Sequence, residues 1–135
     1  MINYLVFFGL VISSFIVFFI HKPTDQTAPI NEEFSKCESP IERRLYKSLK
    51  HNGYRLETQV HCGPYRIDIV LPSYKIAIEC DGKPFHSSAE QKAHDRKKNA
   101  YLRLHGWKVM RFSGRQINSN MSQVLSRIEN EIQSK

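Results

Sequence analysis

The chain has 135 residues and a formal net charge of +7, with 41% hydrophobic and 24% charged residues. This length suits one domain of ordinary size, and the composition excludes a low-complexity or disordered chain. The charge is uneven, because residues 1–20 carry none whereas residues 36–135 carry 19 Lys and Arg against 10 Asp and Glu. A basic domain behind an apolar leader excludes a disulfide scaffold, a fibrous protein and a polytopic transporter. Three widely spaced cysteines without a Cys-x-x-Cys pair indicate reduced thiols in a cytosolic compartment and no structural zinc.

The N-terminal segment is almost continuously apolar from residue 2 to residue 20. At ~1.5 Å per residue, a helix of this length spans close to the ~30 Å hydrocarbon core of a bilayer. A cleaved signal peptide is the main alternative, but the start has no positive charge and no small-x-small cleavage site follows. We therefore predict a single transmembrane helix over residues 1–22. Since His21 and Lys22 follow the span, the positive-inside tendency places the C-terminal domain in the cytoplasm.

Residues 23–36 contain prolines and polar residues without apolar periodicity, which is typical of a mostly irregular tether. The remaining residues, 37–135, are predicted to form the folded domain. Its first helix begins at a capping box, Ser39-Pro40-Ile41-Glu42, and carries an apolar stripe as far as Leu49. Three extended runs follow over residues 55–62, 65–71 and 74–81, and their short connections predict an antiparallel meander.

A second capping box, from Ser87 to Glu90, begins a helix that is predicted to run to about His105. Residues 107–112 form a fourth strand, expected to lie parallel to the third through a right-handed crossover. The chain ends in an amphipathic helix with apolar residues from Met121 to Ile132. The order α-β-β-β-α-β-α predicts an α/β fold, a small mixed sheet flanked by helices.

Strand periodicity predicts where the carboxylates of the sheet point. On the second strand Ile67, Ile69 and Leu71 share one face, which leaves Asp68 on the other. On the third strand the same alternation places Glu79 and Asp81 on one face. Carboxylates that converge repel one another, and oxygen ligands suit Mg²⁺ or Mn²⁺. The simpler alternative is a set of salt bridges with nearby basic residues, namely Arg66, Lys75 or Lys83.

Six short motifs resemble, in order, those of the PD-(D/E)XK restriction-endonuclease-like superfamily. They cover about residues 37–132 and resemble most the branch of very-short-patch-repair endonucleases and small domains of unknown function. The motifs are Ser39 to Glu42, Ile67-Asp68-Ile69, Ile76 to Gly82, His86, Asp95-Arg96-Lys97, and Leu104 to Phe112.

The resemblance implies a role for several residues of the domain. Asp68 corresponds to the central metal-binding Asp, Glu79 corresponds to the second acid, and the main-chain carbonyl of Cys80 is a further ligand. Glu42 corresponds to an acidic residue on the first helix that assists catalysis in this branch. His86 corresponds to one of two histidines of the repair enzymes, and the resemblance implies that Asp95 orients His86. Asp81 stands where the superfamily has a lysine, and the zinc-binding residues of the repair enzymes are missing.

The leading hypothesis is hydrolysis of DNA phosphodiester bonds with Mg²⁺ or Mn²⁺ held by Asp68 and either Glu79 or Asp81. His86 would be the general base or the acid for the leaving group. Cutting both strands would require a homodimer or a second binding event. The predicted phosphate contacts are Lys83, Lys92, Arg96, Lys97, Lys98, Arg111 and Arg115.

Two other hypotheses remain open. The missing motif lysine favours a catalytically inactive, membrane-tethered module that binds nucleic acid. Alternatively, the basic surface binds anionic lipid beside the membrane anchor.

Overall fold

The computed structural model describes residues 32–82 and 88–134. Among these residues no helix is both long enough and apolar enough to cross a membrane. The predicted span, residues 1–22, lies outside the described residues, as does the tether up to residue 31. The described elements are α2 (Glu32–Lys36), α3 (Pro40–His51), β1 (Glu57–Cys62), β2 (Tyr65–Leu71), the short 3₁₀ helix η1 (Pro72–Tyr74), β3 (Ile76–Asp81), α4 (Ala89–Leu104), β4 (Lys108–Ser113), α5 (Gly114–Ser119) and α6 (Met121–Gln133).

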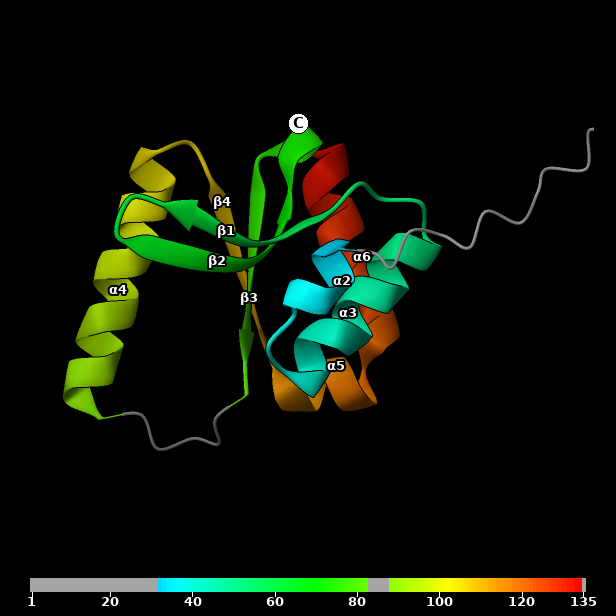
Figure 1. Cartoon of the computed structure of the whole chain (residues 1–135), viewed down its shortest axis with the longest axis horizontal. Helices are drawn as coiled ribbons and strands as arrows, with labels where there is room; N and C mark the ends of the chain where they lie inside the picture. Colours follow the sequence, from blue (N-terminus) through cyan, green and yellow to red (C-terminus); the bar gives the residue numbers. More distant parts are fainter. Residues whose placement is uncertain (1–31, 83–87, 135) are drawn as a thin grey trace, which may run out of the picture. The chain divides into compact units, whose positions relative to one another are not determined.

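The four strands form one mixed sheet in the order β1-β2-β3-β4 (Figure 1). β1 pairs antiparallel with β2, and β2 pairs antiparallel with β3. β4 lies parallel to β3, and α4 connects the two strands. The predicted class, a mixed α/β sheet flanked by helices, is confirmed.

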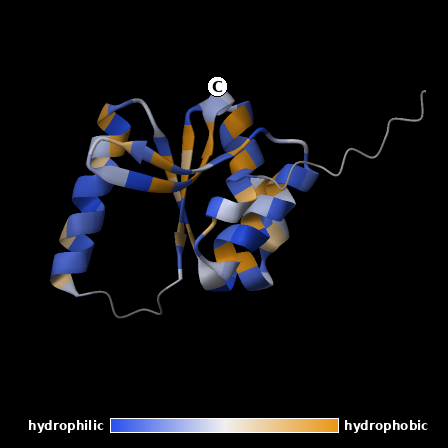
Figure 2. Ribbon diagram, viewed as in Figure 1, coloured by the Kyte–Doolittle hydropathy of each residue, from blue (hydrophilic) through white to orange (hydrophobic). Residues whose placement is uncertain are grey.

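Helices cover both faces of the sheet. On one face, α3, α5 and α6 pack against a cluster that includes Leu45, Ile78, Phe112 and Ile128, all of them fully buried. On the other face lies α4, whose one buried residue, Leu102, contacts a smaller apolar cluster of the sheet. Hydrophobic residues recur along the strands, whereas α4 is mostly hydrophilic (Figure 2). α4 is therefore held partly by ion pairs, which belong to the site described below.

The start of the domain differs from the prediction. Residues 32–36, predicted to belong to an irregular tether, form α2 and pack on β1. Glu33 accepts a hydrogen bond from the backbone nitrogen of Thr58 at 2.5 Å, and the Thr58 hydroxyl donates to the backbone oxygen of Glu33, also at 2.5 Å. The folded domain thus includes Glu32, and its predicted start at residue 37 was wrong. This single helical turn is stabilised by tertiary hydrogen bonds to Thr58. Because these bonds join residues far apart in the chain, the local sequence gives no sign of them.

Several element boundaries also differ. The third strand begins at Ile76 rather than residue 74, because η1 and the left-handed Lys75 (φ 53°) precede it. Ser88 caps α4, one residue after the predicted cap. An additional helix, α5, precedes α6 and begins with its own capping box, Ser113 with Gln116. The first helix begins as predicted, with Ser39 as its cap.

The side-chain alternation of β2 breaks at Asp68. Ile69 packs with α3, α5 and α6, whereas Ile67 packs with Leu102 of α4, so the prediction that the two share a face was wrong. Gln59 lies opposite Asp68 on β1, between the pairs 58–69 and 60–67, and has a left-handed backbone (φ 53°). The left-handed residue of β1 thus lies opposite the position of β2 at which the alternation breaks.

Candidate active site

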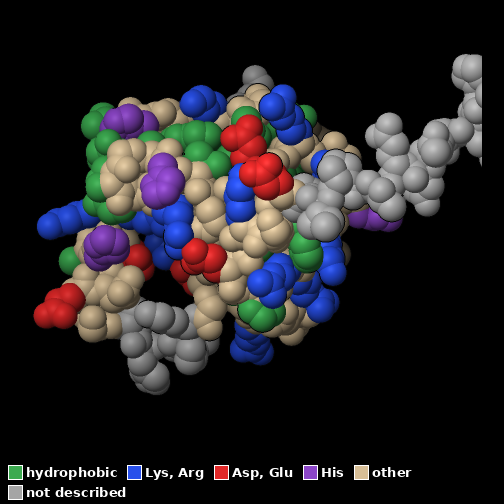
Figure 3. Space-filling model, in the orientation of Figure 1, with side chains coloured by type: hydrophobic (Ala, Val, Ile, Leu, Met, Phe, Trp, Pro, Cys, Tyr) green, Lys and Arg blue, Asp and Glu red, His purple; other side chains and the backbone are tan. Residues whose placement is uncertain are grey.

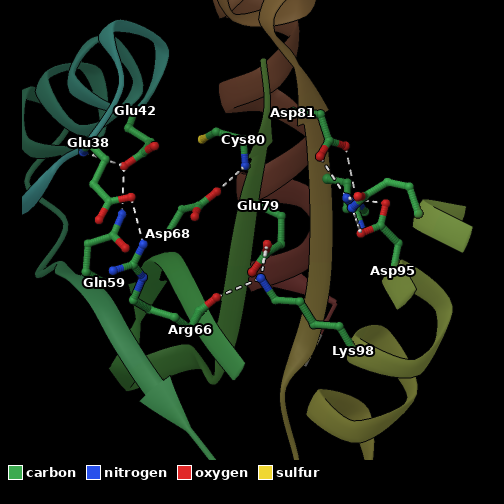
Figure 4. Close-up of polar contacts among 12 residues, drawn as sticks. Glu38, Glu42, Gln59, Arg66, Asp68, Glu79, Cys80, Asp81, Asp95 and Lys98 are labelled. Atoms are coloured by element: carbon green, nitrogen blue, oxygen red, sulfur yellow. Dashed lines mark hydrogen bonds and ion pairs between the residues drawn. The ribbon is translucent and has the colours of Figure 1, made fainter. Parts of the chain in front are cut away.

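β2 and β3 separate at Asp68. Their paired residues run from Leu71 to Ile69 on β2 and end at Ile78 on β3. Beyond this pair a side chain replaces the backbone as the acceptor for β3. The backbone nitrogen of Cys80 donates to Oδ2 of Asp68 at 2.8 Å (Figure 4). The side chain of Asp68 is thus fixed between two strands whose backbones have moved apart.

Lys98 of α4 reaches into the space between these strands. Its ammonium donates to the Arg66 backbone oxygen of β2 at 2.7 Å and to Glu79 Oε2 of β3 at 2.5 Å (Figure 4). Only 15% of the Lys98 side chain and 7% of the Glu79 side chain are exposed. Lys98 therefore bridges the separated strands and does not project into solvent.

Burial raises the pKa of two carboxylic acids of the site, Asp68 and Glu79. Desolvation is the largest cause for Glu79, whose pKa rises to about 7 even though the hydrogen bond from Lys98 opposes the shift. Desolvation also raises the pKa of Asp68, against the hydrogen bond from Cys80. The pKa of the Cys80 thiol is raised first by burial and then by the charges of Asp68, Glu42, Glu79 and Asp81, in that order. Four carboxylates thus lie close enough to Cys80 to raise the pKa of its thiol.

Asp81 and Asp95 share a second cation, Arg111 of β4. Arg111 donates to both carboxylate oxygens of Asp81, at 3.1 and 2.7 Å, and its Nη2 lies 3.3 Å from Asp95 Oδ2. Asp81 is thus turned toward Arg111 and away from the Asp68–Cys80 contact (Figure 4). His86, the predicted partner of Asp95, lies outside the described residues.

Glu42 is buried and fully occupied by hydrogen bonds. It accepts from Ser39 Oγ at 2.7 Å and from the Glu38 nitrogen at 3.0 Å, which completes the cap of α3. Gln59 Nε2 donates to Glu42 Oε2 at 2.8 Å. Glu42 thereby fixes the left-handed residue of β1 that lies opposite Asp68. Gln59 is not among the predicted site residues, and its only signal in the sequence is its position opposite Asp68 in the hairpin register.

The described residues contain no ready-made group of three His, Cys, Asp or Glu side chains that could hold a metal ion. Arg111 binds Asp81, and the convergence of Asp68, Glu79 and Asp81 on one ligand set stays a prediction. The residues nevertheless suit a hard divalent cation at Asp68 and Glu79. Glu79 Oε1 is buried without a hydrogen-bond partner, and an unsatisfied buried carboxylate oxygen is a ligand that Mg²⁺ or Mn²⁺ accepts.

The predicted phosphate-binding residues fall into two groups. Lys98 and Arg111 are half-buried and bind the carboxylates, so the structure assigns them to the site itself. The other described members of the set are exposed on α4 and α5, whereas Lys83 lies outside the described residues. The exposed group comprises Lys92, Arg96, Lys97 and Arg115.

Comparisons with known proteins agree with this architecture. A protein of Escherichia coli (strain K12), the uncharacterised YcjD, is 30% identical over 94 residues, which cover 67% of this chain and 78% of that protein. An uncharacterised protein of Haemophilus influenzae (strain Rd) is 33% identical over 104 residues, covering 75% of this chain but only 64% of its own length. The catalytic domain of the homing endonuclease I-Bth0305I superimposes with a TM-score of 0.58 at 22% identity, over 69% of this chain and 93% of that domain.

The family model and this structural match together support a restriction-endonuclease-like fold. Within this class the chain belongs to the REase_MTES_1575 family, whose model matches residues 41–132. The superfamily-level resemblance is thus confirmed, and the matches give no support to the narrower very-short-patch-repair branch.

Proposed function

We propose that the chain is a metal-dependent endonuclease that hydrolyses DNA phosphodiester bonds. The observation that carries the proposal is a pair of carboxylates on neighbouring strands at the point where the strands separate, the half-buried Asp68 and the buried Glu79. A structural role alone does not explain why Glu79 is buried with one oxygen unsatisfied, because such a group destabilises the fold. A site that binds a cation does explain it.

The roles of the chain's own residues follow from their contacts. Asp68 and Glu79 would hold Mg²⁺ or Mn²⁺, with the Cys80 carbonyl as a further candidate ligand. The bound ion would supply Lewis-acid polarisation of the phosphate and a water of lowered pKa. Lys98 holds Glu79 in place and provides a positive charge beside it. Through that charge Lys98 would stabilise the charge that develops on the phosphate.

Arg111 places Asp81 and Asp95 side by side on the α4 side of the site. From there Asp95 would orient His86, which we propose as the general base or the acid for the leaving group. The surface is hollowed between the N-terminal half of α4 and the sheet, with acidic side chains at the rim (Figure 3). The exposed Lys92, Arg96 and Lys97 of α4 would bind the DNA backbone beside it.

We also propose that residues 1–22 anchor the protein in a membrane as a single span with the nuclease domain on the cytoplasmic side. The support is the uncharged apolar sequence and the His21-Lys22 pair that follows it. A homodimer would allow both strands of a duplex to be cut.

The test is cleavage of supercoiled plasmid and of single-stranded DNA by the full-length chain with Mg²⁺, Mn²⁺ or EDTA. Asp68→Asn keeps an acceptor for the Cys80 nitrogen but removes the charge, so we expect it to abolish cleavage while DNA binding persists. The matched control is Glu129→Gln, an exposed carboxylate of α6, which should cleave like the unchanged chain.

Two outcomes would contradict the proposal. Cleavage that persists in EDTA or in Asp68→Asn would show that the hydrolytic site lies elsewhere. Salt-sensitive DNA binding without any cleavage would favour the inactive nucleic-acid-binding module.

A further inference from the structure

Four rings form a continuous row where α4 meets the β1–β2 hairpin. Tyr65 begins β2, and the other three rings, His94, Tyr101 and His105, belong to α4 and its C-terminal cap. Ring centroids are 5.8 Å apart for His94–Tyr65, 5.3 Å for Tyr65–Tyr101 and 4.1 Å for Tyr101–His105. We call these four residues the ring ladder.

The ring ladder is fixed in place and open at both ends. His94 and His105 are exposed, and the two tyrosines between them are half-buried. His105 stacks on Tyr101 at an interplanar angle of 25°, and its Nδ1 donates to the Tyr101 backbone oxygen at 2.8 Å. Gly63 of the hairpin turn leaves room for Tyr101, because a Cβ at position 63 would collide with the Tyr101 hydroxyl. Rings held in this way lose little conformational entropy when a ligand binds.

The ladder adjoins both the candidate active site and a basic surface. Tyr65 precedes Arg66, whose backbone oxygen binds Lys98, and His94 precedes Asp95. Lys97 lies three residues after His94 and four before Tyr101, so it neighbours both on the helix surface. Lys97 is exposed, and no carboxylate of the described residues pairs with it. Histidine side chains gather over α4 and the hairpin beside basic side chains (Figure 3).

We propose that the ring ladder binds unpaired bases, so that the DNA strand cut at Asp68 and Glu79 is single-stranded next to the scissile phosphate. Exposed rings next to a cation are the combination that binds single strands, since every base has a face that can stack. In a duplex both faces of a base are covered by its neighbours. The inference rests on the proposed function and specifies the class of its substrate.

The test is fluorescence anisotropy with the full-length chain in EDTA, at about pH 8. The probes are a labelled oligothymidylate of about 20 nucleotides and a duplex of the same length. We expect the double variant His94→Ala/His105→Ala to weaken single-strand binding about tenfold or more and to leave duplex binding unchanged. The control His51→Ala removes an exposed histidine at the end of α3, outside the ladder, and should bind like the unchanged chain.

His105→Phe keeps a ring at the end of the ladder and should retain single-strand binding where His105→Ala loses it. Unchanged single-strand binding in the double variant, or an equal loss for single strand and duplex, would overturn the inference. Failure of the proposed function has a different signature. In that case no DNA is cleaved with Mg²⁺ or Mn²⁺, while single-strand binding still depends on the ladder.

Discussion

The ammonium of Lys98 and the carboxylate of Glu79 form an ion pair that is almost closed to solvent. Removing one partner of such a pair leaves the other charge buried without compensation, which is more costly than removing both. Glu79 can reduce this cost by taking up a proton, because its pKa is already about 7. The stability of the domain should therefore depend on Lys98 in a pH-dependent way.

We predict that Lys98→Met lowers the free energy of unfolding by about 3 kcal/mol at about pH 8, and by less at about pH 5.5, where Glu79 is protonated. Urea unfolding at both pH values measures the difference. Lys97→Met, at the exposed neighbouring position, is the matched control and should change stability by about 0.5 kcal/mol or less. If both substitutions change the free energy of unfolding equally, the ion pair of Lys98 with Glu79 makes no specific contribution to stability.

The raised pKa of Glu79 also predicts how the unchanged chain responds to pH. The folded chain keeps the Glu79 proton up to about pH 7, whereas an unfolded chain releases it near the ordinary value of 4.5. The contribution of Glu79 to the free energy of unfolding is therefore most favourable below pH 4.5. This free energy falls as the pH rises from 4.5 to about 7. In EDTA, Glu79→Gln should flatten the unfolding free energy against pH over this window. An identical pH dependence in Glu79→Gln would contradict the assigned pKa.

The residues of the site could be predicted only in part. Asp68 and Glu79 lie in motifs that can be read along single strands, and both occupy the site. Lys98 was predicted to contact phosphate because it belongs to a run of basic residues on a helix. Its inward direction depends on the place where the pairing of β2 and β3 ends, which is a tertiary feature that no local pattern encodes.

At the scale of elements, α2 shows that the domain extends beyond its predicted start. The buried Thr58 of β1 relies on Glu33 for both its backbone nitrogen and its hydroxyl. A chain that begins at residue 37 leaves these groups unsatisfied. It should be less stable than one that begins at residue 31 by about 2–3 kcal/mol, measured by urea unfolding. Equal stability would show that α2 does not belong to the cooperative unit.

The contact between the β1–β2 hairpin and α4 depends on Gly63. An alanine here meets both a left-handed backbone (φ 56°) and the Tyr101 hydroxyl. At Gly53, with φ 82°, an added Cβ meets nothing within 4 Å, so Gly53→Ala has only the backbone cost of about 1 kcal/mol. We predict that Gly63→Ala lowers the midpoint temperature of thermal unfolding by more than Gly53→Ala lowers it. Equal shifts would show that Tyr101 does not dock on the hairpin.

Prediction of the elements succeeded where the signal was local and failed where it was tertiary. The cap at Ser39 and the second strand over residues 65–71 agree with the structure because capping residues and turn residues delimit them. The short helices α2 and α5 were missed. Helices of five and six residues are not stable by themselves, so their neighbours in the fold decide whether they form.

At the level of the whole sheet, we propose that the separation of β2 from β3 presents Asp68 and Glu79 to one divalent ion. The strands pair normally at Ile69 and Ile78, and the carboxylates follow immediately. Arg111 pairs with the neighbouring Asp81 and Lys98 pairs with Glu79, whose second carboxylate oxygen stays without a hydrogen-bond partner. Both carboxylates should then be necessary for metal binding, even without DNA.

The most direct measurement is a calorimetric titration of the full-length chain with Mn²⁺ in the absence of DNA. We predict one site per chain that is lost in both Asp68→Asn and Glu79→Gln and is retained in the surface control Glu129→Gln. Mn²⁺ binding of unchanged affinity in the two site variants would contradict the account, because the ion would then be held elsewhere.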